Sequence, residues 1–225
     1  PPTPQWLEEA GYAWYGRNRE HAAKGGVGIL VRLDLAGPVT STGHKNVTVH
    51  PALVAGKQTG TVWITIQLSS QQHINVGVSY VEPAGRSVEI QNIDVDGMWN
   101  GIGQSLVKHA QDGLTVWGAD ANAHVNGLLE QMPAGGTIPP ARTVELKNDG
   151  TARPHNKYGT LLMEKLGEAD MLTVHGRERN GVLPPWDYSS AKNVHNPEDP
   201  SEPDTAFSTV DYMAVSSAAF SSTWA

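Results

Sequence analysis

The stretch Leu114-Thr-Val-Trp-Gly-Ala-Asp120-Ala-Asn122-Ala-His124 is an apolar run that ends abruptly in polar groups. Residues 114–117 have the β-branched and bulky character of a buried strand, and Gly118 lets the backbone turn or approach another group closely. Asp120 and Asn122 are two residues apart, so in an extended segment they point to the same side. We therefore expect a carboxylate beside a carboxamide at the strand's end, able to hold a proton or a cation and to donate to a phosphate.

An Asp-x-Asn sequence after a strand also has a purely structural interpretation. Such residues commonly form an Asx turn, in which the aspartate side chain caps the chain as it leaves the strand. The motif by itself does not separate a catalytic pair from a turn. The choice depends on the motifs that accompany it elsewhere in the chain.

The composition is that of an ordinary globular protein. The 225 residues are 39% hydrophobic and 17% charged, which suits a single domain over residues 1–225 with a substantial core. No apolar run approaches the roughly 18 residues that span a bilayer. The start, Pro1-Pro-Thr-Pro-Gln5, lacks the pattern of a signal peptide. Cysteine is absent, which fits a reducing, intracellular compartment.

The net charge of −7 argues against a protein that coats nucleic acid through a broad basic surface. A local basic patch is still compatible with this charge. The potential cations Arg17, Arg19, His21 and Lys24 follow one another in a short polar stretch. This stretch is interpreted either as such a patch or as a solvated surface loop.

Hydrophobic periodicity predicts several strands and helices. We expect strands at 11–15, 24–32, 46–53, 61–68, 73–80, 171–175 and 205–216, helices at 98–111 and 157–170, and a short helical or irregular lead-in at 6–9. Asp94-Val-Asp-Gly97 lacks the remaining ligands of a calcium loop and is predicted as a turn. The ranges 126–155 and 181–204 are predicted as surface loops. The strand, helix, strand succession around 98–111 favours a layered α/β fold.

Two further residues stand out at strand positions. Tyr80 lies where the predicted strand at 73–80 gives way to Val81-Glu82-Pro83, and proline ends a ladder. A tyrosine there is usually a half-buried packing residue whose hydroxyl finds a neighbour. Asp211 is a carboxylate within the otherwise apolar strand at 205–216, which is costly unless the carboxylate is paired or hydrogen-bonded.

Five motifs, in this order along the chain, carry a resemblance to a known superfamily. They are Gly25-Gly-Val-Gly-Ile-Leu-Val31, Tyr80-Val-Glu-Pro83, Gly118-Ala-Asp120-Ala-Asn122-Ala-His124, Asn156-Lys-Tyr-Gly159-Thr-Leu-Leu162 and Ser208-Thr-Val-Asp211-Tyr212. From Gly11 to Ser216 the chain resembles the endonuclease/exonuclease/phosphatase superfamily, and within it most closely the endonuclease domains of non-LTR retrotransposons and their apurinic-site endonuclease relatives. The resemblance implies a four-layer α/β sandwich, with two mixed β-sheets face to face, helices outside, and a site at the sheet ends.

The resemblance also implies roles for individual residues. Tyr80 resembles the tyrosine that contacts the phosphate, and Asp120 the aspartate that activates or aligns the attacking water. Asn122 resembles the asparagine that binds the phosphate, and Asp211 the carboxylate that orients a catalytic histidine. Such a site uses Mg²⁺ or Mn²⁺ to hydrolyse a phosphodiester, here in nucleic acid and in DNA rather than RNA.

Two elements of the superfamily are not found in this sequence. The metal-binding glutamate has no counterpart, because Glu8 and Glu9 follow no apolar strand. The closing Ser-Asp-His has none either, since the sequence finishes Ala219-Phe-Ser-Ser-Thr-Trp-Ala225. Two expectations follow: a piece of a longer metal-dependent endonuclease, or a catalytically silent fold that docks onto a protein or ribonucleoprotein partner, with no membrane involved. His124 and His175 are interpreted as structural hydrogen-bonders rather than replacements for the missing histidine.

Overall fold

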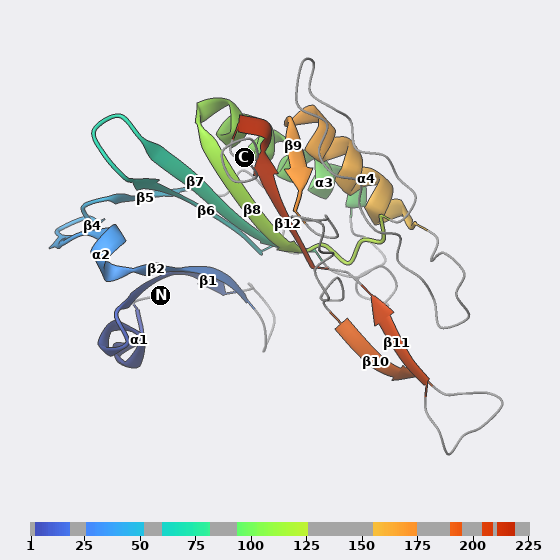
Figure 1. The fold of residues 1–225 in the computed structure, drawn as a ribbon, viewed down its shortest axis with the longest axis horizontal. Coiled ribbons are helices and arrows are strands. Elements are labelled where there is room, and N and C mark those ends of the chain that lie inside the picture. Colours follow the sequence, from blue (N-terminus) through green and yellow to red (C-terminus); the bar gives the residue numbers. More distant parts are fainter. Residues whose placement is uncertain are drawn as a thin grey trace, which may run out of the picture.

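A six-stranded mixed sheet organises the part of the chain that the computed structural model describes, namely residues 3–18, 26–51, 60–81, 94–125, 155–174, 190–194, 204–208 and 211–218. In spatial order its strands are β5 (Val47–His50), β6 (Gly60–Gln67), β7 (His73–Tyr80), β8 (Leu114–Asp120), β12 (Asp211–Ser216) and β9 (Met171–Thr173) (Figure 1). Neighbours are antiparallel except β7 and β8, which are parallel. The predicted α/β class is confirmed.

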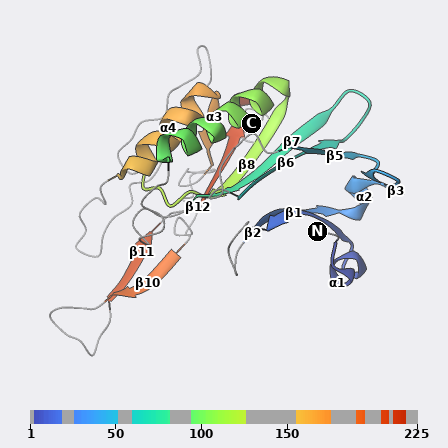
Figure 2. The same ribbon diagram turned by 180° about the vertical axis from the view of Figure 1, so that it is seen from behind.

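Helices cover one face of this sheet. α3 (Val95–Asp112) connects β7 to β8, and α4 (Lys157–Glu168) packs beside it (Figures 1 and 2). The largest fully buried side chains between helices and sheet include Trp99, Ile102 and Leu106 of α3, Trp117 of β8, and Leu162 and Leu166 of α4. The α3 residues recur at helical spacing, so a single apolar stripe fixes the helix on the sheet.

A β-hairpin covers part of the opposite face. Its strands β1 (Tyr12–Asn18) and β2 (Gly26–Arg32) are antiparallel and pack on β6 and β7. Apolar side chains fill the space between, the buried ones on the strands being Ala13, Val27, Val31, Val62, Ile64 and Ile66. The short elements α1 (Gln5–Glu9), α2 (Leu33–Ala36), β3 (Val39–Thr40) and β4 (Gly43–His44) adjoin the hairpin or lead into β5. The six-stranded sheet thus lies between the helices α3 and α4 on one face and the β1–β2 hairpin on the other.

The predicted turn at Asp94–Gly97 is instead the start of α3. The carboxylate oxygen Oδ1 of Asp94 accepts the N–H of Gly97 at 2.8 Å. This bond is the one by which an aspartate caps a helix, because the first N–H groups of a helix have no partner within it.

The predicted strand at 205–216 is two strands. β11 (Asp204–Ser208) pairs with β10 (Ser190–Val194), which itself lies inside the predicted loop at 181–204. β12 begins only at Asp211, opposite Asp120, the last residue of β8. β11 and β12 therefore belong to different sheets, although the apolar pattern continues across both strands.

Other sequence predictions fall on residues that are not described. The predicted loop at 126–155 lies outside the described residues except for His155. Among the basic residues of 17–24, only Arg17 has a described side chain. No helix in the described part of the chain is long and apolar enough to cross a membrane.

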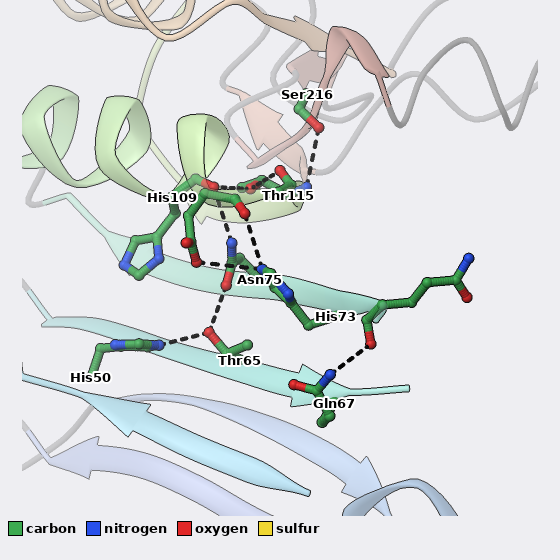
Figure 3. Close-up of polar contacts among 11 residues, drawn as sticks. His50, Thr65, Gln67, His73, Asn75, His109, Thr115 and Ser216 are labelled. Carbon is green, nitrogen blue, oxygen red and sulfur yellow. Dashed lines mark hydrogen bonds and ion pairs between the residues drawn. The ribbon is translucent and has the colours of Figure 1, made fainter. Parts of the chain in front are cut away.

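Polar side chains tie the C-terminal end of α3 to the sheet (Figure 3). The carbonyl oxygen of His109 accepts hydrogen bonds from Asn75 Nδ2 at 3.0 Å and from Thr115 Oγ1 at 2.8 Å. Thr65 Oγ1 donates to Asn75 Oδ1, and His50 Nε2 lies 2.7 Å from Thr65 Oγ1. Because buried polar groups are costly unless bonded, this network fixes β5, β6, β7 and β8 relative to α3.

The ring of His109 lies in an apolar setting. His109 is 2% exposed, stacks on the Trp63 indole with ring centroids 4.2 Å apart, and meets the His50 ring edge-on at 4.8 Å. Burial, followed by the nearby His50 and Lys108, lowers the pKa of His109 to about 4, and Asp112 opposes part of this effect. The imidazole is therefore neutral at neutral pH.

We expect mild acid to destabilise the fold through His109. The unfolded chain protonates this imidazole near pH 6.5, whereas the folded chain does so only near pH 4. Between these values the unfolded state binds more protons, so the free energy of unfolding falls as the pH falls, by about 2 kcal/mol between pH 7 and pH 5. Urea unfolding at both pH values measures this loss.

Two variants separate His109 from the other histidines. His109→Gln should lose the part of the pH dependence that His109 carries, whatever its stability at neutral pH, and the pH dependence that is left includes that of His50, whose pKa burial also lowers. His73→Gln should keep it, because the half-buried His73 ring lies at the end of α3, where it contacts the Asp112 carbonyl and carboxylate. Equal pH dependence in the wild-type protein and His109→Gln would contradict the assignment.

Candidate functional site

Residues from four strands meet at one end of the six-stranded sheet. The register places Gly60, Tyr80, Asp120 and Asp211 side by side on β6, β7, β8 and β12, each paired with the next. Directly paired positions share a face of the sheet. Three residues that the sequence marks separately are thereby brought to one place, and we call Tyr80, Asp120 and Asp211 the rim.

The rim lies on the hairpin face of the sheet. Trp117 and Ala119 of β8 belong to the core beneath the helices, so Asp120 lies on the other face. Tyr212 belongs to the same helix-side core, which puts position 211 on the hairpin side as well. Tyr80 is half-buried against the hairpin core, as expected of a tyrosine that packs at a strand's exit.

The chain turns immediately after Asp120. Asp120 Oδ1 accepts the N–H of Asn122 at 3.3 Å, and Asn122 has a φ of +47°, a left-handed conformation that asparagine tolerates better than most residues. Asn122 Nδ2 donates to the carbonyl oxygen of Val81 at 2.7 Å. The backbone is not extended at Asn122, so the extended segment from which a same-side pair was expected does not reach this residue. The Asx turn is present.

Asn156 fastens this turn to α4. Its Oδ1 accepts the N–H groups of His124 at 3.0 Å and Gly159 at 2.7 Å, and its Nδ2 donates to the carbonyl oxygen of Asn122 at 3.1 Å. Asn156 is thus the N-cap of α4 and also a clamp on the loop after β8. A Cβ at Gly159 would overlap the carbonyl oxygen of His124, so glycine is needed for this close approach.

The resemblance assigns no role to Asn156, although the sequence holds a signal for one. An asparagine immediately before an amphipathic run is the pattern of a helix start. The clamp on residues 122 and 124 is a tertiary contact and leaves no local signal. His124 takes part through its backbone N–H and carbonyl, and His175 lies outside the described residues.

Two aspartate positions of the rim, Asp120 and Asp211, are directly paired. In the described ranges, no group of three or more histidine, aspartate or glutamate residues is placed to hold a metal. Mg²⁺ is usually held by one or two carboxylates and several waters. A pair of aspartates is therefore of the type that would suit a hydrated Mg²⁺ or Mn²⁺.

Comparison with known proteins adds no assignment to this geometry. The sequence matches no family model, and no curated protein matches it.

Replacing Asn156 tests whether it holds the loop after β8. Asn156→Ala removes the N-cap of α4 and the bonds to Asn122 and His124, and we expect the free energy of unfolding to fall by about 2 kcal/mol. Thr160→Ala is the matched control, because its exposed hydroxyl makes only a 3.5 Å bond to the Asn156 carbonyl. Its loss should stay within about 0.5 kcal/mol. Equal losses in urea unfolding would show that Asn156 is not a clamp.

Proposed function

We propose that the rim is the catalytic site of a metal-dependent phosphodiester hydrolase of the endonuclease/exonuclease/phosphatase type, acting on nucleic acid. The observation that supports this most is the pairing of Asp120 with Asp211. The register sets two aspartate positions side by side at the sheet end, and carboxylates are ligands that Mg²⁺ takes. A cation beside a phosphate is what phosphodiester hydrolysis requires.

The proposal includes the four-layer α/β sandwich of that superfamily. The helices α3 and α4 correspond to the first layer, and the six-stranded sheet that they cover corresponds to the second. The β1–β2 hairpin on the other face has the position of part of the second sheet. The rim then lies where the two sheets meet at their ends, which is where the superfamily has its site.

Each rim residue has a task suited to its chemistry. Asp120 aligns the attacking water and accepts its proton, and Asp211 supplies the second carboxylate at the sheet end. One N–H of the Asn122 carboxamide is used on Val81, which orients the group. Its second N–H is then aimed at a phosphate oxygen, and Tyr80 contacts the same phosphate. Mg²⁺ or Mn²⁺, when bound, would stabilise negative charge on the phosphate and the leaving oxygen.

A second candidate is a catalytically silent domain that binds a partner protein. One observation favours it: Asp120 and Asn122 already serve in the Asx turn and in the bond to Val81. A fold that needs these residues for its own structure keeps them without any activity.

Cleavage assays separate the two candidates. We expect the protein to nick supercoiled or abasic-site DNA with Mg²⁺ or Mn²⁺, and Asp120→Asn to lower the rate by at least about 100-fold, because the general base is lost. Asp112→Asn is the control, since Asp112 is an exposed carboxylate beside His73 at the opposite end of the same strands. Its rate should equal that of the wild-type protein.

Two other results would contradict catalysis at the rim. A folded protein that cleaves no DNA or RNA with any divalent metal favours the silent domain. Equal loss of cleavage in Asp120→Asn and Asp112→Asn would place the active residues away from the rim.

A further inference from the structure

The loop after β8 is held by hydrogen bonds from two other elements. The carbonyl oxygen of Asn122 accepts from Asn156 Nδ2 at 3.1 Å. That of Ala123 accepts from Tyr212 Oη of β12 at 3.2 Å. The carbonyl oxygen of His124 accepts from the Asn156 N–H at 3.1 Å, where the loop passes the N-terminal end of α4 (Figure 1). Distant residues therefore fix the conformation of this loop.

The backbone at Asn122 is the strained point of the loop. Its φ of +47° lies in the left-handed region, which is unfavourable for a residue with a side chain unless its surroundings hold it there. The bond from Asn156 Nδ2 reaches the carbonyl of this same residue. Without that bond the backbone can relax toward a right-handed or extended conformation, and the Cα–Cβ bond then points in another direction. Asn156 thus controls the direction of the Asn122 side chain.

This direction matters for the chemistry assigned to Asn122. Its Nδ2 donates to the carbonyl oxygen of Val81 at 2.7 Å. A carboxamide has two N–H donors, and in the proposed function the second one meets a phosphate oxygen. A donor stabilises developing negative charge best when its direction is already fixed and no reorganisation is needed during the reaction.

From these contacts we propose that Asn156 is a positioning residue of the reaction. It holds the Asn122 backbone in its left-handed conformation and so aims the Asn122 carboxamide at the phosphate. The inference rests on the proposed function and extends it to the residue that caps α4. The two roles of Asn156 use different atoms, because Oδ1 accepts the Gly159 N–H of the cap and Nδ2 holds Asn122.

Two substitutions separate positioning from capping. Asn156→Asp keeps an acceptor for the N–H groups of His124 and Gly159 but replaces the donor Nδ2 with an oxygen. Asn156→Ser keeps a hydroxyl that caps a helix and adds no charge. In urea unfolding, both variants should have a higher midpoint than Asn156→Ala, because both retain an N-cap.

Cleavage kinetics test the positioning role. Both variants should cleave DNA with a kcat about 30-fold below the wild-type value and a KM within about threefold of it, because the lost alignment matters most as charge develops on the phosphate. Adding Asn156→Asp to Asn122→Ala should lower kcat no further, since Asn156 acts through Asn122. Asn100→Asp is the matched control, because it makes the same change at an exposed position of α3. It should cleave like the wild-type protein.

Nuclear magnetic resonance provides a second readout that needs neither metal nor substrate. In EDTA, the side-chain amide protons of Asn122 are identified by their absence from the spectrum of Asn122→Ala. They should be well dispersed in the wild-type protein and shift toward random-coil positions in Asn156→Asp and Asn156→Ser. A purely capping role of Asn156 would leave these signals in place.

The outcomes separate this inference from the function on which it rests. If both Asn156 variants keep the wild-type kcat, or if the Asn122 signals do not move, the positioning role is wrong, and the proposed function stands as long as Asp120→Asn is inactive. A further fall in kcat when Asn156→Asp is added to Asn122→Ala also overturns the inference, because Asn156 then acts by another route. If the wild-type protein cleaves no nucleic acid, the proposed function is wrong and the role of Asn156 in it is wrong as well.

Discussion

The parallel pairing of β7 with β8 is the constraint on which the rest of the structure depends. Parallel neighbours need a crossover connection, and α3 supplies it. At one end of this ladder, Asn75 and Thr115 lie opposite each other and both donate to the carbonyl oxygen of His109, which anchors α3. At the other end, the same register sets Tyr80 opposite Asp120. A single ladder thus fixes the helix layer and builds the rim.

Local sequence pattern predicts most of the sheet but not its assembly. The alternation in 61–68 and 73–80 predicts β6 and β7, and the stripe through Ile102 and Leu106 predicts α3, because neighbours within a few residues decide which side chains are buried. Register is a contact between distant residues and leaves no such pattern. The apolar pattern at 205–216 accordingly predicts one strand, although its two parts pair with different partners, β11 with β10 and β12 with β8 and β9.

In the candidate site, too, the local sequence predicts the elements but not the contacts between distant residues. The sequence marks Asp120 and Asn122 correctly as the end of a strand, but the left-handed backbone at Asn122 decides how the two side chains lie. Asn156 carries a local signal as the N-cap of α4, but its clamp on the loop after β8 is a tertiary contact that leaves no such signal.

The rim depends on the register in which β8 pairs with β12, with Asp211 opposite Asp120. Because the chain has no cysteine, introduced pairs of cysteines test this register directly. Gly118 and Met213 are paired on the same face, with room for a side chain at Gly118 and Met213 exposed. Under mild oxidation, Gly118→Cys with Met213→Cys should form an intramolecular disulfide, whereas Gly118→Cys with Val215→Cys, offset by one pair on that face, should keep free thiols. A disulfide in the offset pair and free thiols in the direct pair would contradict the register, and with it the rim.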